Sequence, residues 1–66
     1  MFGPNEFNDL SRASQLGLLE DARVLNEEAQ LTTFQLADMN VEVRFTDDPL
    51  EVQEVFAYDP RRLDSI

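Results

Sequence analysis

The side chains that could do chemistry in this sequence are carboxylates and hydroxyls, because the chain contains no His, no Cys and no Lys. Ser11, Ser14 and Ser65 therefore lack the usual base that activates a nucleophilic hydroxyl, and Tyr58 is the single phenol. Paired carboxylates can act as general acid and base, as in glycosidases, but that reaction needs a substrate cleft. A chain of 66 residues seldom builds such a cleft alone. The composition predicts that the protein is not an enzyme.

The densest group of possible metal ligands is Asp47, Asp48 and Glu51. Calcium or magnesium would need more oxygen ligands and a loop that wraps around them, and the glycine-containing calcium-loop pattern is absent. Asp side chains are also favoured in turns and before helices, where they accept backbone hydrogen bonds. We interpret the group as a turn or a helix cap, and we expect no metal ion and no cofactor.

The charge balance is strongly acidic, with 14 carboxylates against five Arg and a net charge of −9. Direct binding to nucleic acid is disfavoured, since it depends on cationic side chains that neutralise phosphates. Two interpretations of the charge remain open. It can serve solubility, or it can steer the chain to a basic partner, in the extreme by imitating the phosphates of DNA. We also expect no secretory signal peptide and no membrane partner, because Met1-Phe2-Gly3-Pro4 is followed by polar residues and no long apolar run occurs.

The sequence predicts one small α+β domain over residues 1–66. Residues 1–8 read as an N-terminal arm with a Gly-Pro turn, and Asn8 or Asp9 could cap a helix within residues 9–30. An apolar stripe at helical spacing supports this helix; its members are Leu18, Ala22, Leu25 and Ala29. Residues 59–66 form a short tail.

Residues 31–58 are β-rich. Phe34 and Leu36, then Val41, Val43 and Phe45, alternate with polar residues around a turn expected at residues 38–40, which predicts a β-hairpin whose apolar face packs on the helix stripe. Residues 49–58 have two interpretations. Their β-forming residues favour a third strand of an antiparallel meander, whereas Pro49 and Glu51 after Asp48 resemble a helix start. The fold is therefore one helix on a hairpin or on a three-stranded meander.

More apolar residues are present than the expected core face can use, which favours burial against other protein subunits. We expect a homo-oligomer or a part of a larger assembly. The residues expected to bind partners are apolar residues off the stripe, the arm, and the tail with its two Arg: Phe2, Phe7, Leu16, Val24, Arg61, Arg62, Leu63 and Ile66.

Part of the chain also resembles a known family. Leu31-Thr32-Thr33-Phe34, Val41-Glu42-Val43-Arg44-Phe45 and Asp47-Asp48-Pro49 with Glu51-Val52 resemble the small head–tail joining (stopper or neck) proteins of tailed phages, over residues 31–52. The resemblance implies a non-enzymatic structural protein of a phage-like particle, located in the virion or the host cytoplasm, that bridges its neighbours in a ring. The alternative is an acidic DNA mimic that inhibits a nucleic-acid-binding protein.

Overall fold

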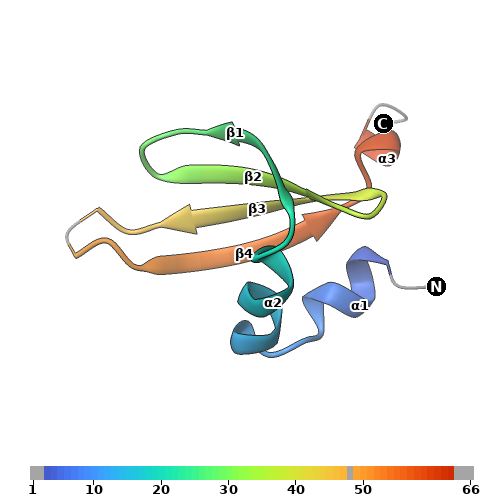
Figure 1. The fold of residues 1–66 in the computed structure, drawn as a ribbon, viewed down its shortest axis with the longest axis horizontal. Helices are drawn as coiled ribbons and strands as arrows, with labels where there is room; N and C mark the ends of the chain where they lie inside the picture. Colours follow the sequence, from blue (N-terminus) through green and yellow to red (C-terminus); the bar gives the residue numbers. More distant parts are fainter. Residues whose placement is uncertain (1–2, 48, 64–66) are drawn as a thin grey trace.

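The protein is an α+β chain in which short helices lie on one face of an antiparallel sheet (Figure 1). The computed structural model describes residues 3–47 and 49–63. Within them the elements follow one another as α1 (Pro4–Asn8), α2 (Arg12–Leu19), β1 (Arg23–Glu27), β2 (Leu31–Leu36), β3 (Met39–Phe45), β4 (Val52–Tyr58) and α3 (Pro60–Leu63). The four strands form a meander in the order β1-β2-β3-β4, so β1 and β4 are the two edges.

The predicted hairpin is confirmed as β2 and β3. Phe34 lies opposite Val41, and Leu36 lies opposite Met39, which leaves Ala37 and Asp38 as the two turn residues. The turn therefore comes one residue earlier than expected. Ala37 has a φ of 55°, the left-handed conformation that a two-residue hairpin turn demands and that a side chain makes unfavourable.

Residues 52–58 adopt the strand alternative and pair with β3 along its length. A register shift between Arg44 and Phe45 places Val52 opposite Phe45. Because of this irregularity, Val55 and Ala57 are buried, whereas Phe56 projects from the other face with half of its surface exposed. The irregularity also places Val52 on the core side with Val55, although simple alternation would place it on the face of Phe56.

The single helix predicted over residues 9–30 is wrong. Residues 4–8 of the expected arm form α1, and the cap of the next helix is Ser11, whose Oγ accepts the Ser14 N–H at 3.2 Å. Helix α2 ends at Leu19, and residues 23–27 form β1, which pairs with β2. The sheet thus has a fourth strand, β1, which was not predicted because the helical spacing of Leu18, Ala22 and Leu25 favoured a helix. In the structure, Ala22 and Leu25 do not share a helix with Leu18.

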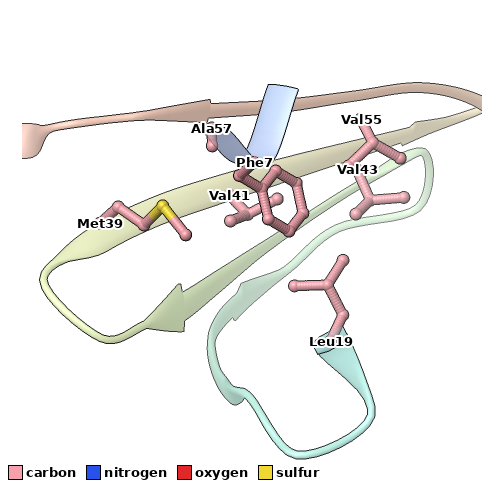
Figure 2. Packing of buried hydrophobic residues seen from close by; sticks show 7 residues of the cluster. All are labelled: Phe7, Leu19, Met39, Val41, Val43, Val55 and Ala57. Atoms are coloured by element: carbon pink, nitrogen blue, oxygen red, sulfur yellow. The ribbon is translucent and has the colours of Figure 1, made fainter. Parts of the chain in front are cut away.

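The core lies between one face of the sheet and the two N-terminal helices (Figure 2). Met39, Val41 and Val43 of β3 line its centre, with Val55 and Ala57 beside them on β4. The helices contribute Phe7 from α1, which is completely buried, and Leu19 from α2. The apolar hairpin face was predicted correctly, but its cover is Phe7 and Leu19 rather than the proposed stripe, of which Leu18 and Leu25 remain exposed.

Two amide side chains attach the helices to the rest of the chain. The buried Gln15 side chain donates from Nε2 to the Phe7 carbonyl at 3.0 Å, which joins α2 to α1. Asn8 bonds both backbone groups of Ala57, which joins α1 to β4. Buried polar groups are thereby satisfied where the helices cross the sheet. Among the described residues, the helices are too short and too polar for any of them to cross a membrane.

Candidate functional site

The residues predicted to bind partners are scattered over the fold. Phe7 is completely buried in the chain's own core, so it packs back on the domain and is not an exposed anchor. Leu16 on α2 and Val24 on β1 are exposed, at 36% and 50% of their surfaces. Arg61 is exposed at the start of α3. Four predictions lie outside the described residues or their described side chains: Phe2, Arg62, Leu63 and Ile66.

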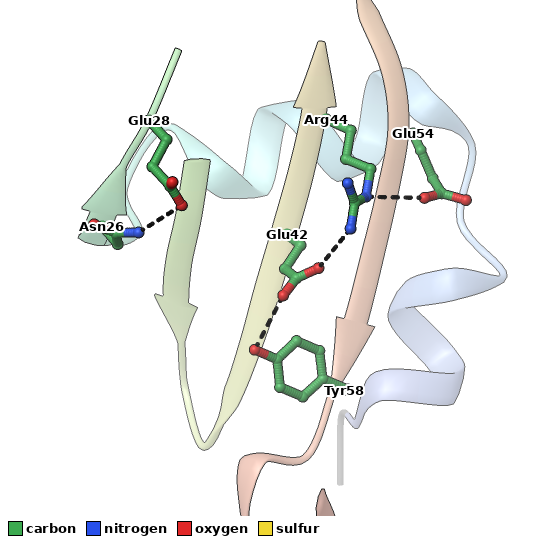
Figure 3. A network of polar contacts seen from close by, with 6 residues as sticks. All are labelled: Asn26, Glu28, Glu42, Arg44, Glu54 and Tyr58. Atoms are coloured by element: carbon green, nitrogen blue, oxygen red, sulfur yellow. Dashed lines mark hydrogen bonds and ion pairs between the residues drawn. The ribbon is translucent and has the colours of Figure 1, made fainter. Parts of the chain in front are cut away.

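The face of the sheet that turns away from α1 and α2 carries a line of charged and aromatic side chains (Figure 3). Arg44 lies between two carboxylates, with Nη2 3.9 Å from Glu42 Oε1 and Nε 3.6 Å from Glu54 Oε1. Tyr58 Oη donates to Glu42 Oε2 at 3.5 Å. These ion pairs are solvent-exposed, so each contributes well under about 1 kcal/mol to folding.

An aromatic pair continues this line on β4. The rings of Phe56 and Tyr58 stack with centroids 6.2 Å apart and planes inclined by 22°. Phe56 lies opposite Glu42 in the register with β3 and is half exposed. An apolar ring flanked by carboxylates is suited to contact a protein surface that offers aliphatic and cationic groups.

The edge strand β1 is the most exposed element of the sheet. Each of its residues is exposed, and Val24 and Leu25 keep 50% and 45% of their surfaces accessible. Leu25 is the extra residue in a register irregularity between Val24 and Asn26, which bends the strand. Although β1 pairs with β2 on one side, the backbone groups along the free edge of such a strand are a template for another strand.

The opposite edge, β4, is occupied at Ala57. Asn8 Nδ2 donates to the Ala57 carbonyl at 3.0 Å, and the Ala57 N–H donates to Asn8 Oδ1 at 2.8 Å. The side-chain amide thus makes the pair of bonds that a neighbouring strand would make at this position. The two edges of the sheet are therefore chemically different.

A hollow of about 330 Å³ lies where the start of α1, the β2–β3 turn and the start of α3 meet. Its charged groups are Asp38, Asp59 and Arg61. Asp59 Oδ1 accepts from the Arg61 backbone N–H at 2.9 Å and from Nε at 3.2 Å. This hydrogen bonding, followed by the charges of Asp59 and Asp38, raises the pKa of Arg61 above its ordinary value. The Arg61 guanidinium is thus already hydrogen-bonded to Asp59 and lies in the field of Asp38.

Of the hydroxyls considered for catalysis, Ser11, Ser14 and Tyr58 have structural partners, and Ser65 lies outside the described residues. Ser11 caps α2, and its hydroxyl donates to Ser14 Oγ at 3.1 Å. Thr46 organises the loop after β3, donating to the Pro49 carbonyl at 2.6 Å and accepting the Glu51 N–H at 3.0 Å. No cluster of three or more potential metal ligands occurs among the residues that the structure describes.

Sequence reasoning missed three features of these surfaces. Leu25 was assigned to the helix stripe, Phe56 only to a possible third strand, and Asn8 to a possible helix cap. The local strand signal was weak, because Val24 is the single β-branched residue of residues 23–27, and the competing helical spacing obscured it. The pairing of Asn8 with Ala57 spans 49 residues and has no local signal.

Comparison with protein-family models, curated proteins and solved structures finds no match to this chain.

Proposed function

We propose that this protein is a non-catalytic protein–protein interaction module that works as a subunit of a larger assembly. The observation that carries the proposal is the one-sided cover of the sheet. Helices α1 and α2 protect one face, while Phe56 on the other face and Val24 and Leu25 at the β1 edge stay about half exposed. Exposed large apolar side chains in a chain this small are typical of contact surfaces.

The specific assembly that we propose is a phage-like particle, in which the chain is a head–tail connector or another minor virion protein. Support comes from the resemblance over residues 31–52, a stretch that spans β2, β3 and the loop that leads into β4. The same stretch makes the central hairpin on which the helices pack. Under this proposal the location is the virion or the host cytoplasm, and the partners are other protein subunits.

The absence of catalysis remains part of the proposal. Its support is that the Ser11 and Ser14 hydroxyls bond each other at the start of α2, and that Tyr58 donates to Glu42, a carboxylate that is also ion-paired with Arg44. Nucleophilic hydroxyls need a base that removes their proton, and the chain has no His and no Lys.

A second candidate is an acidic DNA mimic. The observation that favours it is a group of exposed carboxylates between the end of α2 and the β1–β2 turn: Glu20, Asp21, Glu27 and Glu28. Against it, Arg23 lies within this group, and Glu42 and Glu54 on the open face already contact Arg44. A mimic needs carboxylates that a cationic surface can reach without such competition.

Co-purification with a salt gradient separates the two candidates. The tagged chain is recovered from cells that produce it, the captured proteins are washed at rising salt, and they are identified by mass spectrometry. Val24→Ser with Phe56→Ser tests the apolar contacts, and Glu27→Gln with Glu28→Gln tests the carboxylates. Leu50→Ser is the control for loss of an exposed apolar side chain elsewhere, since Leu50 is exposed in the loop between β3 and β4.

We expect protein subunits that stay bound at high salt and are lost only from the Val24→Ser/Phe56→Ser variant. Contacts made by apolar burial resist screening, whereas a phosphate mimic loses affinity steeply as salt rises. The opposite result is capture of a DNA-binding protein that rising salt releases and that only the Glu27→Gln/Glu28→Gln variant fails to bind. That result would refute the interaction module and establish the mimic.

A further inference from the structure

The two edges of the sheet have unequal capacity for strand pairing. At the β4 edge, Asn8 occupies the N–H and the carbonyl of Ala57, so an incoming strand would have to displace α1. At the β1 edge every residue is exposed, and in Figure 1 no other element lies beyond β1. Among the described residues, addition of a strand is therefore obstructed at Ala57 of β4, whereas at β1 only the bulge at Leu25 interrupts the open edge.

The charges along β1 are complementary to those of the same strand run in the opposite direction. Arg23 stands at its start, Glu27 at its end, and Glu28 directly follows. In an antiparallel pair of two β1 strands centred on Leu25, Arg23 of each copy lies opposite Glu27 of the other. A register one residue further sets Arg23 opposite Glu28 instead. Either register places unlike charges across the pair at both ends; the first sets Leu25 opposite Leu25, and the second sets it opposite Asn26.

We infer that the β1 edge binds a second copy of this chain through antiparallel β1–β1 pairing. The inference rests on the proposed function, because it names one partner of the interaction module. The two meanders then join into one continuous sheet. In the pair centred on Leu25, Leu25 of each copy lies opposite Leu25 of the other, and Val24 lies opposite Asn26. Such a contact is isologous, so each copy uses its open edge once.

This pairing closes at two copies. Extension by head-to-tail contact would require β1 of one copy to pair with β4 of the next, where Asn8 already bonds Ala57. The contact is small and joins two chains of net charge −9, so it is a weak, reversible dimer. A larger assembly would then use the open face with Phe56, not the sheet edges.

The test uses sedimentation equilibrium of the full chain over a range of concentrations at moderate salt, with charge-reversed variants. Arg23→Glu makes β1 acidic at both ends, and Glu27→Arg with Glu28→Arg makes it basic at both ends. Each variant alone sets like charges opposite each other in the pair. Mixed together, the two variants set unlike charges opposite each other again. Arg12→Glu, on exposed α2, is the control with the same net charge as Arg23→Glu.

We expect wild type and Arg12→Glu to dimerise, each charge-reversed β1 variant to be monomeric, and their equimolar mixture to form a heterodimer. Amide signals that shift with concentration should map to residues 23–27. A wild-type monomer at all concentrations, or a dimer that Arg23→Glu leaves intact, would overturn the inference. If the wild-type chain is monomeric but still retains other protein subunits in the co-purification, self-pairing fails while the proposed function stands. If it retains none, both fail.

Discussion

The sharpest test of how this small fold is held together is Asn8→Ala. The substitution removes the two hydrogen bonds between the Asn8 side chain and the Ala57 backbone, at 3.0 and 2.8 Å. A protein hydrogen bond contributes about 1 kcal/mol net to the free energy of unfolding, so the pair contributes about 2 kcal/mol. Ala57 is buried but Asn8 is only half-buried, so water can enter the space that the amide vacates, and we do not add a full penalty for leaving the Ala57 groups unpaired.

That loss is large for this chain. At roughly 0.05–0.15 kcal/mol per residue, a 66-residue domain has about 3–10 kcal/mol of stability in total. A loss of about 2 kcal/mol in a domain of this size lowers Tm by roughly 8–16 °C. Urea unfolding and thermal unfolding followed by circular dichroism measure both quantities, and hydrogen exchange at the Ala57 amide reports the bond directly.

The matched control is Asn5→Ala. Asn5 is exposed on the same short helix, so both substitutions change helix propensity equally while only one removes contacts to β4. If Asn8→Ala unfolds within about 0.5 kcal/mol of Asn5→Ala, the side chain does not hold α1 on the sheet. The reasoning about the occupied β4 edge then fails with it.

Three further substitutions test local features of the fold by urea unfolding. Gly17→Ala should stabilise by about 0.5–1 kcal/mol, because a methyl group at this α2 position meets no atom within 4 Å and lowers the entropy of the unfolded chain; no gain would mean that α2 is not a stable helix there. Ala37→Gly should stabilise by about 0.5–1 kcal/mol by relieving the positive φ of 55°, whereas a loss would contradict that conformation. Thr46→Val should destabilise by about 1–2 kcal/mol by removing the hydroxyl bonds to Pro49 and Glu51, while Thr33→Val, half-buried on β2, should change stability little; equal losses would refute the role of Thr46.

The hairpin could be predicted because its signal is local. Val41, Val43 and Phe45 alternate with polar residues, and this period both forms the strand and decides which face is buried. The third strand was less certain, because Pro49 and Glu51 imitate a helix start while Val52 and Val55 favour a strand. Pairing with β3 decided between them, and that pairing is not encoded in residues 49–58 alone.

The N-terminal half could not be predicted for a related reason. Leu18, Ala22 and Leu25 have helical spacing, yet the chain turns after Leu19 and residues 23–27 satisfy their backbone groups against β2. Pairing with the next strand overrides a local helical preference when a hairpin edge is available. The burial of Phe7 has the same origin, since its position depends on contacts made across the whole chain.

The link between Asn8 and Ala57 also orders the events of synthesis. The two residues lie 49 positions apart, and the surface on which Phe7 is buried includes the last strand of the sheet. As the chain leaves the ribosome, β1, β2 and β3 can pair with their sequence neighbours, but α1 is made first and must wait for its docking site. We therefore expect folding to finish only after β4 has emerged. Until then, the apolar face of the partly formed sheet stays exposed to solvent. The first helix of this protein is the last to be secured.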